Sequence, residues 1–384
     1  MSTKNDVNNL QHLPWLDGLR GIAALWVMLS HIQILSGLRS LPVLSWGNVA
    51  VDLFMMLSGF LMAHHYVLRQ DKEPWNKKNT AFTFWIRRFF RIAPLYYVLL
   101  IAAFLFGPQL GDFRDNIAAL WPSTATDPDR YNDQTSINLI THISFVFGLL
   151  PDFSFRTALP DWSIGLEMLF YLVFPLVMYA MGKFGTLKVT LILVILCVMT
   201  QIVFSEYVHS FPMPSFLPLK LNIFMAGIWM AIGRSRHQMN LAMLVAIALC
   251  FVSLVNSPIY VVLSQSLLII SLFFLMNDGS LNIANNFPHS VERLRRILSS
   301  KFAVFLGDTS YAVYLLHLMI VLPIAGTLAA QEGFGDLNQY LRFFMIAVPV
   351  LPLTYFIAWV LYNAIEKNGI NLGKRLLKTS FLKS

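Results

Sequence analysis

The sequence predicts an all-α integral membrane protein of about ten transmembrane helices, with both termini in the cytoplasm. Of its 384 residues, 57% are hydrophobic and only 12% are charged, whereas about a quarter of the residues of a soluble domain are charged. Apolar runs of about 20 residues, the length needed to cross a bilayer, recur along the chain. Lysine and arginine collect in alternate connecting loops, as expected for cytoplasmic loops.

The apolar runs define the predicted spans in chain order. We place them near residues 16–37, 46–68, 84–106, 162–181, 186–205, 217–234, 240–257, 258–277, 302–330 and 340–364. A further apolar run, residues 137–150, is shorter than a crossing requires. This run also contains Thr141, His142 and Ser144. We therefore predict that it is a re-entrant or interfacial segment.

The distribution of basic residues supports this count and orientation. With a cytoplasmic N-terminus, about three quarters of the lysines and arginines fall on the cytoplasmic side, as the positive-inside rule requires. Counting residues 137–150 as a span would place the basic loop 293–301 outside. The net charge of +8 is thereby explained by membrane topology, and no nucleic-acid partner is needed.

The chain is predicted to form one membrane domain, residues 1–366, followed by a basic cytoplasmic tail, residues 367–384. The long external loop, about residues 107–161, is acidic and aromatic. It is compatible with facing a hydrophilic substrate and equally with being only a solvated loop. Cys197 and Cys250 lie in apolar runs without the spacing of a metal site, so we interpret them as core residues.

Ionisable residues within the predicted spans are the first candidates for function. A charge at the bilayer centre costs on the order of 2.5–3.5 kcal/mol, so such residues are seldom retained without a role. They are Asp17, Arg20 and His31 in the first span, Asp52 in the second, Arg87, Arg88 and Arg91 in the third, Glu167 in the fourth, and Asp308, Tyr311 and His317 in the ninth.

Helical geometry predicts a divided site. Arg20 and His31 fall on one helix face, about 16 Å apart along the axis, and Glu167 enters from the opposite side to a depth similar to that of His31. Arg20, Arg88 and Arg91 are then placed to bind a phosphorylated donor at the cytoplasmic mouth. His31 would accept a proton from an attacking hydroxyl. Glu167 would fix its tautomer, as the third member of a catalytic triad does.

Each of these residues also has a structural interpretation. Arg87, Arg88 and Arg91 are compatible with positive-inside anchors at a helix start. His317 is compatible with a hydrogen-bonded structural histidine, and Asp52 with a partner of Arg20 or of the backbone. No zinc-protease, nucleophile-elbow, Walker or dinucleotide motif occurs in the sequence.

The ordered segments resemble the acyltransferase 3 family of membrane O-acyltransferases. LDGLRGIAALWVMLSH is similar to its first-helix signature, in which an arginine and a histidine flank ten residues, here Arg20 and His31. Arg88 and Arg91 match its R-x-x-R motif. The remaining matches, over about residues 13–365, are VDLFMMLSGFLM, DWSIGLEMLFYLVFP with Glu167, and SYAVYLLH with His317.

The resemblance implies a donor, an acceptor and a location. The donor is cytoplasmic acetyl-CoA or another short acyl-CoA, used as a substrate rather than a resident cofactor, and the usual acceptor is a carbohydrate hydroxyl. The expected location is the bacterial inner membrane. Some members carry a C-terminal esterase-like domain that is not expected here, which would leave transfer to the membrane domain or to a separate periplasmic partner.

The resemblance also assigns roles to residues. It implies that His31 is catalytic, as general base or acyl carrier, with Glu167 as its partner. It also implies that Arg20, Arg88 and Arg91 are essential, in donor binding or in the architecture of the site. The supporting residues are Asp17, Asp52, Trp162, Ser163, Tyr311 and His317. A water-accessible channel beside the first helix is expected, because a polar donor does not cross lipid.

A proton-coupled secondary transporter is the competing hypothesis. Such a protein also buries arginine, histidine and carboxylates near the midplane. However, its two halves commonly contain matching spans interrupted by glycine or proline, and no such pair is evident in this sequence.

Overall fold

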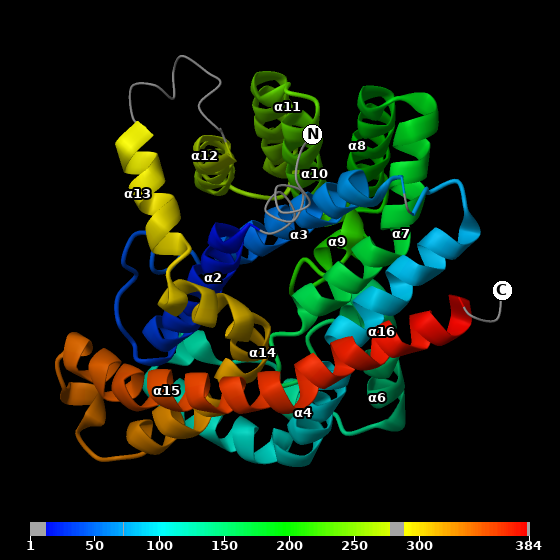
Figure 1. Cartoon of the computed structure of the whole chain (residues 1–384). Coiled ribbons are helices and arrows are strands. Elements are labelled where there is room, and N and C mark those ends of the chain that lie inside the picture. The colour runs from blue at the N-terminus through cyan, green and yellow to red at the C-terminus, as the bar shows by residue number, and fades with distance from the viewer. Residues whose placement is uncertain (1–12, 72, 277–287, 382–384) are drawn as a thin grey trace.

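The computed structural model describes residues 13–71, 73–276 and 288–381, and within these ranges it is helical without any strand. The α-helices (Figure 1) are α2 (Pro14–Leu35), α3 (Gly47–Arg69), α4 (Lys78–Leu120), α5 (Asp129–Asn132), α6 (Ser136–Ile143), α7 (Trp162–Phe184), α8 (Thr186–Val203), α9 (Ser205–His209), α10 (Leu221–Ser235), α11 (Met239–Phe251), α12 (Ile259–Met276), α13 (Pro288–Leu298), α14 (Lys301–Ala329), α15 (Gln339–Leu361) and α16 (Lys367–Phe381). Short 3₁₀ turns cover Pro122–Thr124, Val146–Leu149, Pro151–Phe153, Leu217–Leu219, Val252–Val255 and Phe334–Asp336.

The prediction of a multi-pass membrane fold is confirmed. Eight helices in the described residues are long and apolar enough to cross a membrane. They correspond to eight of the predicted spans. The other two, 217–234 and 240–257, correspond to α10 and α11, whose 15 and 13 residues are shorter than a full crossing requires. Their crossing, and the orientation of the termini, remain predictions.

The outer surface of the bundle is apolar. Leu176 of α7 and Ile195 of α8 are 67% and 58% exposed, and Val348 and Phe356 of α15 are 67% and 63% exposed. Water would disfavour so extensive an apolar surface. These helix faces are therefore suited to contact with lipid.

Helix α4 is longer than the sequence predicted. The predicted span ended at residue 106, before Gly107 and Pro108, but the helix continues to Leu120 and comprises 43 residues. Proline lacks the N–H that would bond the carbonyl four residues earlier, here that of Phe104. The side-chain amide of Gln134 donates to this carbonyl over 2.9 Å. The expected external loop, 107–161, therefore begins only at residue 121.

Residues 137–150 do not form a single crossing helix. The eight-residue α6 ends at Ile143, and a 3₁₀ turn follows at Val146–Leu149. Phe145, between the two, has the left-handed conformation with φ of 60°, which interrupts the helix. Its re-entrant or interfacial location stays a prediction.

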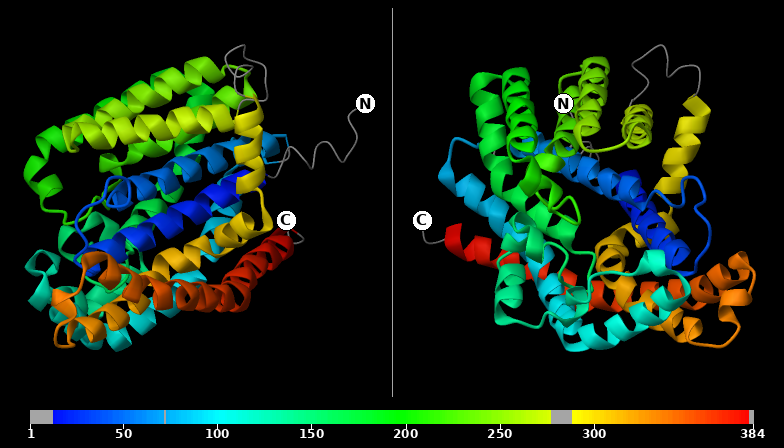
Figure 2. Two further views of the ribbon diagram at one scale, coloured as in Figure 1. Left: turned by 90° about the vertical axis from the view of Figure 1, so that its left-hand side faces the viewer. Right: turned by 180° about the vertical axis from the view of Figure 1, so that it is seen from behind.

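Residues 367–384, predicted as a basic cytoplasmic tail, are helical over Lys367–Phe381. Residues Tyr362–Glu366 form a π-helical turn that joins α15 directly to α16. Two glycines of α16 lie directly against α4. A Cβ added to Gly369 would lie 2.7 Å from Pro94, and one added to Gly373 would lie 2.8 Å from Phe90, so a side chain at either position would clash with α4. The segment is thus a helix packed closely on α4 (Figure 2). Residues 382–384 lie outside the described part of the chain.

Helices α2 and α14 pack backbone to backbone near their N-termini. A Cβ added to Gly307 would lie 2.3 Å from the carbonyl oxygen of Asp17, and one added to Gly21 would lie 2.6 Å from the amide nitrogen of Gly307. Small residues allow membrane helices to approach this closely. We call the end of the bundle formed by the N-termini of α2 and α4, the C-terminus of α3 and α16 the basic end. The opposite end, formed by α5, α6 and the segment 121–161, is the loop end.

Candidate active site

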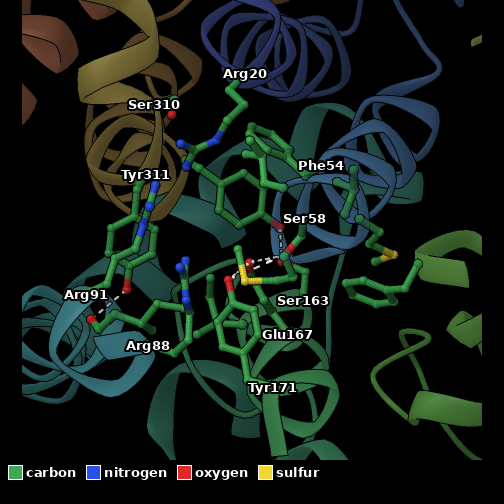
Figure 3. A pocket seen from close by; sticks show the side chains of 18 residues that line it. Arg20, Phe54, Ser58, Arg88, Arg91, Ser163, Glu167, Tyr171, Ser310 and Tyr311 are labelled. Atoms are coloured by element: carbon green, nitrogen blue, oxygen red, sulfur yellow. Dashed lines mark hydrogen bonds between the residues drawn. The ribbon is translucent and has the colours of Figure 1, made fainter. Parts of the chain in front are cut away.

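A central pocket lies among α2, α3, α4, α7, α10 and α14 (Figure 3), with an empty volume of about 770 Å³. Its apolar walls include Phe54, Ile92 and Phe224. Its polar lining consists of Arg20, Ser58, Arg88, Arg91, Ser163, Glu167, Tyr171, Ser310, Tyr311 and Tyr314.

Three predicted arginines meet in this pocket, and none of them forms a close ion pair with a described carboxylate. Among the described residues, no carboxylate lies within ion-pair distance of Arg20, Arg88 or Arg91. The Arg88 guanidinium stands 5.8 Å from the centre of the Tyr171 ring, and its Nε is buried without a hydrogen-bond partner. Leaving a buried charge unpaired is costly. The arrangement is therefore suited to an anionic ligand.

Glu167 is held by two hydroxyl groups at the wall of the central pocket. Its Oε1 accepts hydrogen bonds from Ser58, over 2.9 Å, and from Tyr171 one turn further along α7. The described contacts of Glu167 include no bond to His31. The geometric expectation that Glu167 would orient His31 is therefore wrong, because Glu167 points toward α3 and His31 is engaged elsewhere.

His317 takes the position beside His31 that was expected for Glu167. The Nε2 of His317 lies 3.1 Å from the Nδ1 of His31, and the two rings are 4.9 Å apart. His317 is fully buried. It lies on α14, the helix that packs against α2.

The backbone determines the tautomers of this histidine pair. The Nδ1 of His317 lies 2.6 Å from the carbonyl oxygen of Tyr314, and the Nδ1 of His31 lies 3.0 Å from that of Val27. A carbonyl oxygen only accepts hydrogen bonds, so each Nδ1 must carry a hydrogen. The hydrogen on His31 is then shared with the free Nε2 of His317. The lone pair on the Nε2 of His31 remains available for chemistry.

Tyr314 lies between the central pocket and the histidine pair. Its hydroxyl is 2.7 Å from the hydroxyl of Ser163, and its ring is 6.1 Å from the ring of His317. Tyr311, one turn earlier, donates to the carbonyl oxygen of Ile92 over 2.9 Å and also lines the pocket. His31 does not line the pocket, so a continuous channel past it remains a prediction.

The remaining supporting residues lie outside this pocket. Asp52 pairs with Lys220 over 2.7 Å and accepts from Gln265 over 2.6 Å, so the alternative that it pairs with Arg20 is wrong. Trp162 packs partly buried against the apolar core. The backbone of Asp17 forms the close contact with Gly307 described above.

Sequence reasoning missed Glu366. It lies in the π-helical turn, is 5% exposed, and its Oε2 is buried without a hydrogen-bond partner. Its charge interacts with those of Arg91 and Arg20 across the basic end. An isolated carboxylate just beyond the last apolar run was a usable signal, but the residue fell beyond the predicted end of that span.

Two arginines from the loop end interact electrostatically with His31. Arg114 of α4 and Arg130 of α5 are near enough to interact with its charge. Arg130 is buried, with its guanidinium 3.7 Å from the centre of the Phe155 ring and its Nε donating to the carbonyl oxygen of Thr157. Both ends of the bundle thus direct cationic groups toward its interior.

Comparison with known proteins identifies the family. A family model described as an acyltransferase domain matches residues 13–363. The chain belongs to the acyltransferase 3 family. No solved structure matches this chain. Family membership supports an O-acyltransferase enzyme and removes the basis of the transporter hypothesis.

Two relatives illustrate the range of this acyltransferase family. The acyltransferase MdmB of Streptomyces mycarofaciens is 27% identical over 94% of this chain and 93% of its own length. The O-acetyltransferase OatA of Staphylococcus aureus is 25% identical over 81% of this chain. The matched region spans about half the length of OatA, 51%.

Proposed function

We propose that this acyltransferase moves a short acyl group, preferably acetyl, from cytoplasmic acyl-CoA to a hydroxyl group of a carbohydrate, within the bacterial inner membrane. The assignment of acyl-CoA as the donor rests on the arginines of the central pocket, which form no close ion pair with a described carboxylate. Guanidinium groups bind phosphate oxygens through charge-assisted hydrogen bonds. The name of the relative OatA, an O-acetyltransferase, supports acetyl as the group transferred.

The orientation of the enzyme follows from its charges. The basic end carries Arg69, Arg87, Arg88 and Arg91, together with the basic helix α16. The positive-inside rule favours a cytoplasmic location for this end. Acyl-CoA then enters the central pocket from the basic end, and the acceptor approaches His31 from the loop end.

His31 is the proposed general base. Its Nε2 takes the proton of the attacking hydroxyl while the hydroxyl oxygen forms a bond to the acyl carbonyl carbon. The carbon–sulfur bond then breaks, and the CoA thiolate leaves and is protonated. The positive charge that develops on His31 is stabilised by the lone pair of His317 and by the carbonyl oxygen of Val27, which both accept from Nδ1–H.

The two halves of the site meet at Tyr314. This side chain lines the central pocket and contacts the ring of His317. Delivery of the acyl group to His31 therefore requires the thioester to pass this tyrosine or to displace it from Ser163. The same His31 lone pair also suits direct acylation, in which His31 would carry the acyl group before transfer.

Acetyl-CoA turnover by purified protein tests the proposal. Thiol release is measured with a mixed glycan extract as acceptor, and the product is checked by mass spectrometry for an added acetyl ester. We expect His31→Ala to lose activity by more than about a hundredfold, the scale of general-base catalysis, and Arg88→Ala to lose donor binding and with it thiol release. His289→Ala and Arg296→Ala, on an exposed helix, serve as matched controls.

The outcome also distinguishes the two roles of His31. An acyl adduct on His31 in protein incubated with acetyl-CoA alone would establish the carrier role and contradict the general-base proposal. Absence of thiol release from folded wild-type protein with every acceptor would overturn the proposed donor.

A further inference from the structure

A second cavity lies at the basic end and adjoins the central pocket. It has an empty volume of about 800 Å³. The two cavities share Arg88 and Arg91 in their walls. Apart from Ile370, the lining of the second cavity is basic and consists of His65, Arg69, Arg87, Arg88, Arg91 and Lys374. We call this space the basic cavity.

Only part of the charge in the basic cavity is neutralised by the protein. Glu73 binds both terminal nitrogens of Arg87, over 2.7 and 2.6 Å, and lies 4.0 Å from Arg69. No ion pair to Lys374 occurs among the described residues, and the Nε of Arg88 is buried without a partner. One carboxylate thus serves several cations, and the cavity retains a positive potential that attracts anions.

The wall that carries Lys374 is held in place. Lys374 follows Gly373 directly, and α16 packs on α4 at Gly369 and Gly373, as described above. Helix α16 is also continuous with α15 through the π-helical turn. The ammonium group of Lys374 is therefore presented by a fixed helix opposite α3 and α4. A preorganised arrangement of this kind lowers the entropic cost of binding.

We propose that the basic cavity binds the phosphate groups at the nucleotide end of acyl-CoA, with Lys374 and Arg69 as direct contacts. The acyl-pantetheine arm then extends past Arg88 and Arg91 into the central pocket. This inference rests on the proposed function and adds a second subsite to it. The phosphate of an anionic lipid headgroup has the same chemistry, so the test must separate the two sources.

Calorimetric titration of the purified full-length protein, in detergent free of anionic lipid, tests the subsite. The probes are CoA, 3′-dephospho-CoA and pantetheine. Because hydrogen bonds to charged groups are among the stronger ones in proteins, we expect wild type to bind CoA about tenfold or more tightly than 3′-dephospho-CoA. Pantetheine, without any phosphate, should bind most weakly.

Three variants locate the contact. The quantity compared is the affinity for CoA relative to 3′-dephospho-CoA and relative to pantetheine. Lys374→Ala and Arg69→Ala should each remove most of one of these two preferences. Neither variant should change the affinity for pantetheine. Lys378→Ala is the matched control, since Lys378 lies one turn further along α16 and does not line the cavity. It should retain the wild-type preference.

The possible failures are distinguishable. If wild type binds CoA and pantetheine equally but still releases thiol from acetyl-CoA, the phosphate subsite is overturned while the acyl-CoA donor stands. If Lys374→Ala and Arg69→Ala keep the full preference, their assignment is overturned. If wild type binds no form of CoA and releases no thiol, the proposed donor fails. In that case, stabilisation by phosphatidylglycerol but not phosphatidylcholine nanodiscs that depends on Lys374 would assign the cavity to lipid.

Discussion

Gly21 and Gly307 are in contact ten residues before His31 and His317, respectively, in two helices that run side by side. The separation in sequence is the same, 286 residues, for the glycine contact and for the histidine pair. Helices α2 and α14 therefore keep a single register over about 15 Å, which is ten residues of helical rise. The glycine contact at the basic end sets the distance between the histidines further along.

Gly307→Ala is predicted to disable the enzyme without touching either histidine. The added methyl would lie 2.3 Å from the carbonyl oxygen of Asp17, so α14 must shift away from α2. Overpacking of this kind costs about 1–3 kcal/mol. We expect a lower melting temperature in detergent and a loss of thiol release. Gly182→Ala, with no atom within 4 Å of the added Cβ, is the control and should be neutral. Wild-type activity of Gly307→Ala would contradict the role given to the register.

His317 is predicted to be a positioning residue. His317→Ala removes the acceptor for the Nδ1–H of His31 and should lower kcat about a hundredfold with little change in KM. His317→Gln supplies a carbonyl acceptor and should restore part of this loss. The pH–rate profile separates this role from a structural one.

A change in the pH profile is expected because His317 contacts the ring that titrates. Besides His317, the charged groups near His31 are Arg114 and Arg130, which remain in the variant. Loss of the acceptor changes the balance between neutral and protonated His31, so the acid limb of the profile should shift in His317→Ala. An unchanged acid limb with reduced kcat would indicate that His317 only packs the helices.

The buried pair of Asp52 and Lys220 is predicted to stabilise the fold only while both charges are present. Removing one partner of a buried ion pair costs about 3–5 kcal/mol. Asp52→Ala or Lys220→Ala should therefore lower the melting temperature strongly. The double variant Asp52→Leu with Lys220→Met should recover part of the loss. If the double variant is less stable than either single one, the predicted coupling is absent.

Asp161 is predicted to make stability depend on pH. It precedes α7, outside the spanning helices, and burial raises the pKa of its carboxyl group, against the opposing effects of His142 and of hydrogen bonds from Thr157 and Tyr96. A raised folded-state pKa means that ionisation costs folding free energy. This contribution is favourable below the ordinary pKa and is lost as pH rises through the folded-state pKa.

The measurement is the melting temperature of wild type and Asp161→Asn from about pH 4 upward, the ordinary range of an aspartate pKa. The asparagine variant stays neutral, so its melting temperature should decline less with rising pH. Asp152→Asn, at an exposed site in the same segment, should follow wild type. Parallel curves for all three proteins would contradict the prediction.

The sequence alone was sufficient to predict the long helices and several of the charged residues that line the central pocket. Apolar run length predicted the long helices, and the cost of intramembrane charge singled out Arg20, Arg88, Arg91 and Glu167, which all line the pocket. What it could not supply were partners chosen by packing. The partner of His31 lies 286 residues away, and only the contact between α2 and α14 reveals it.

The predicted ends of two helices were wrong, in each case for a local physical reason. Pro108 normally ends a helix, but Gln134 supplies the missing donor to α4. Glu366 lies beyond the last apolar residues, yet a π-helical turn carries the helix onward and returns this carboxylate to the protein interior. Neither compensation leaves a periodic pattern in the sequence.

The length of α4 has a consequence for where an acceptor meets the enzyme. Its 43 residues measure about 65 Å along the helix, roughly twice the thickness of the hydrocarbon layer. A helix of this length exceeds what one crossing of the lipid tails requires. Under the proposed function, its far end lies in water, where a long sugar polymer can rest. Only the hydroxyl to be esterified then has to reach inward, so on this proposal a polymer is modified without being drawn into the membrane.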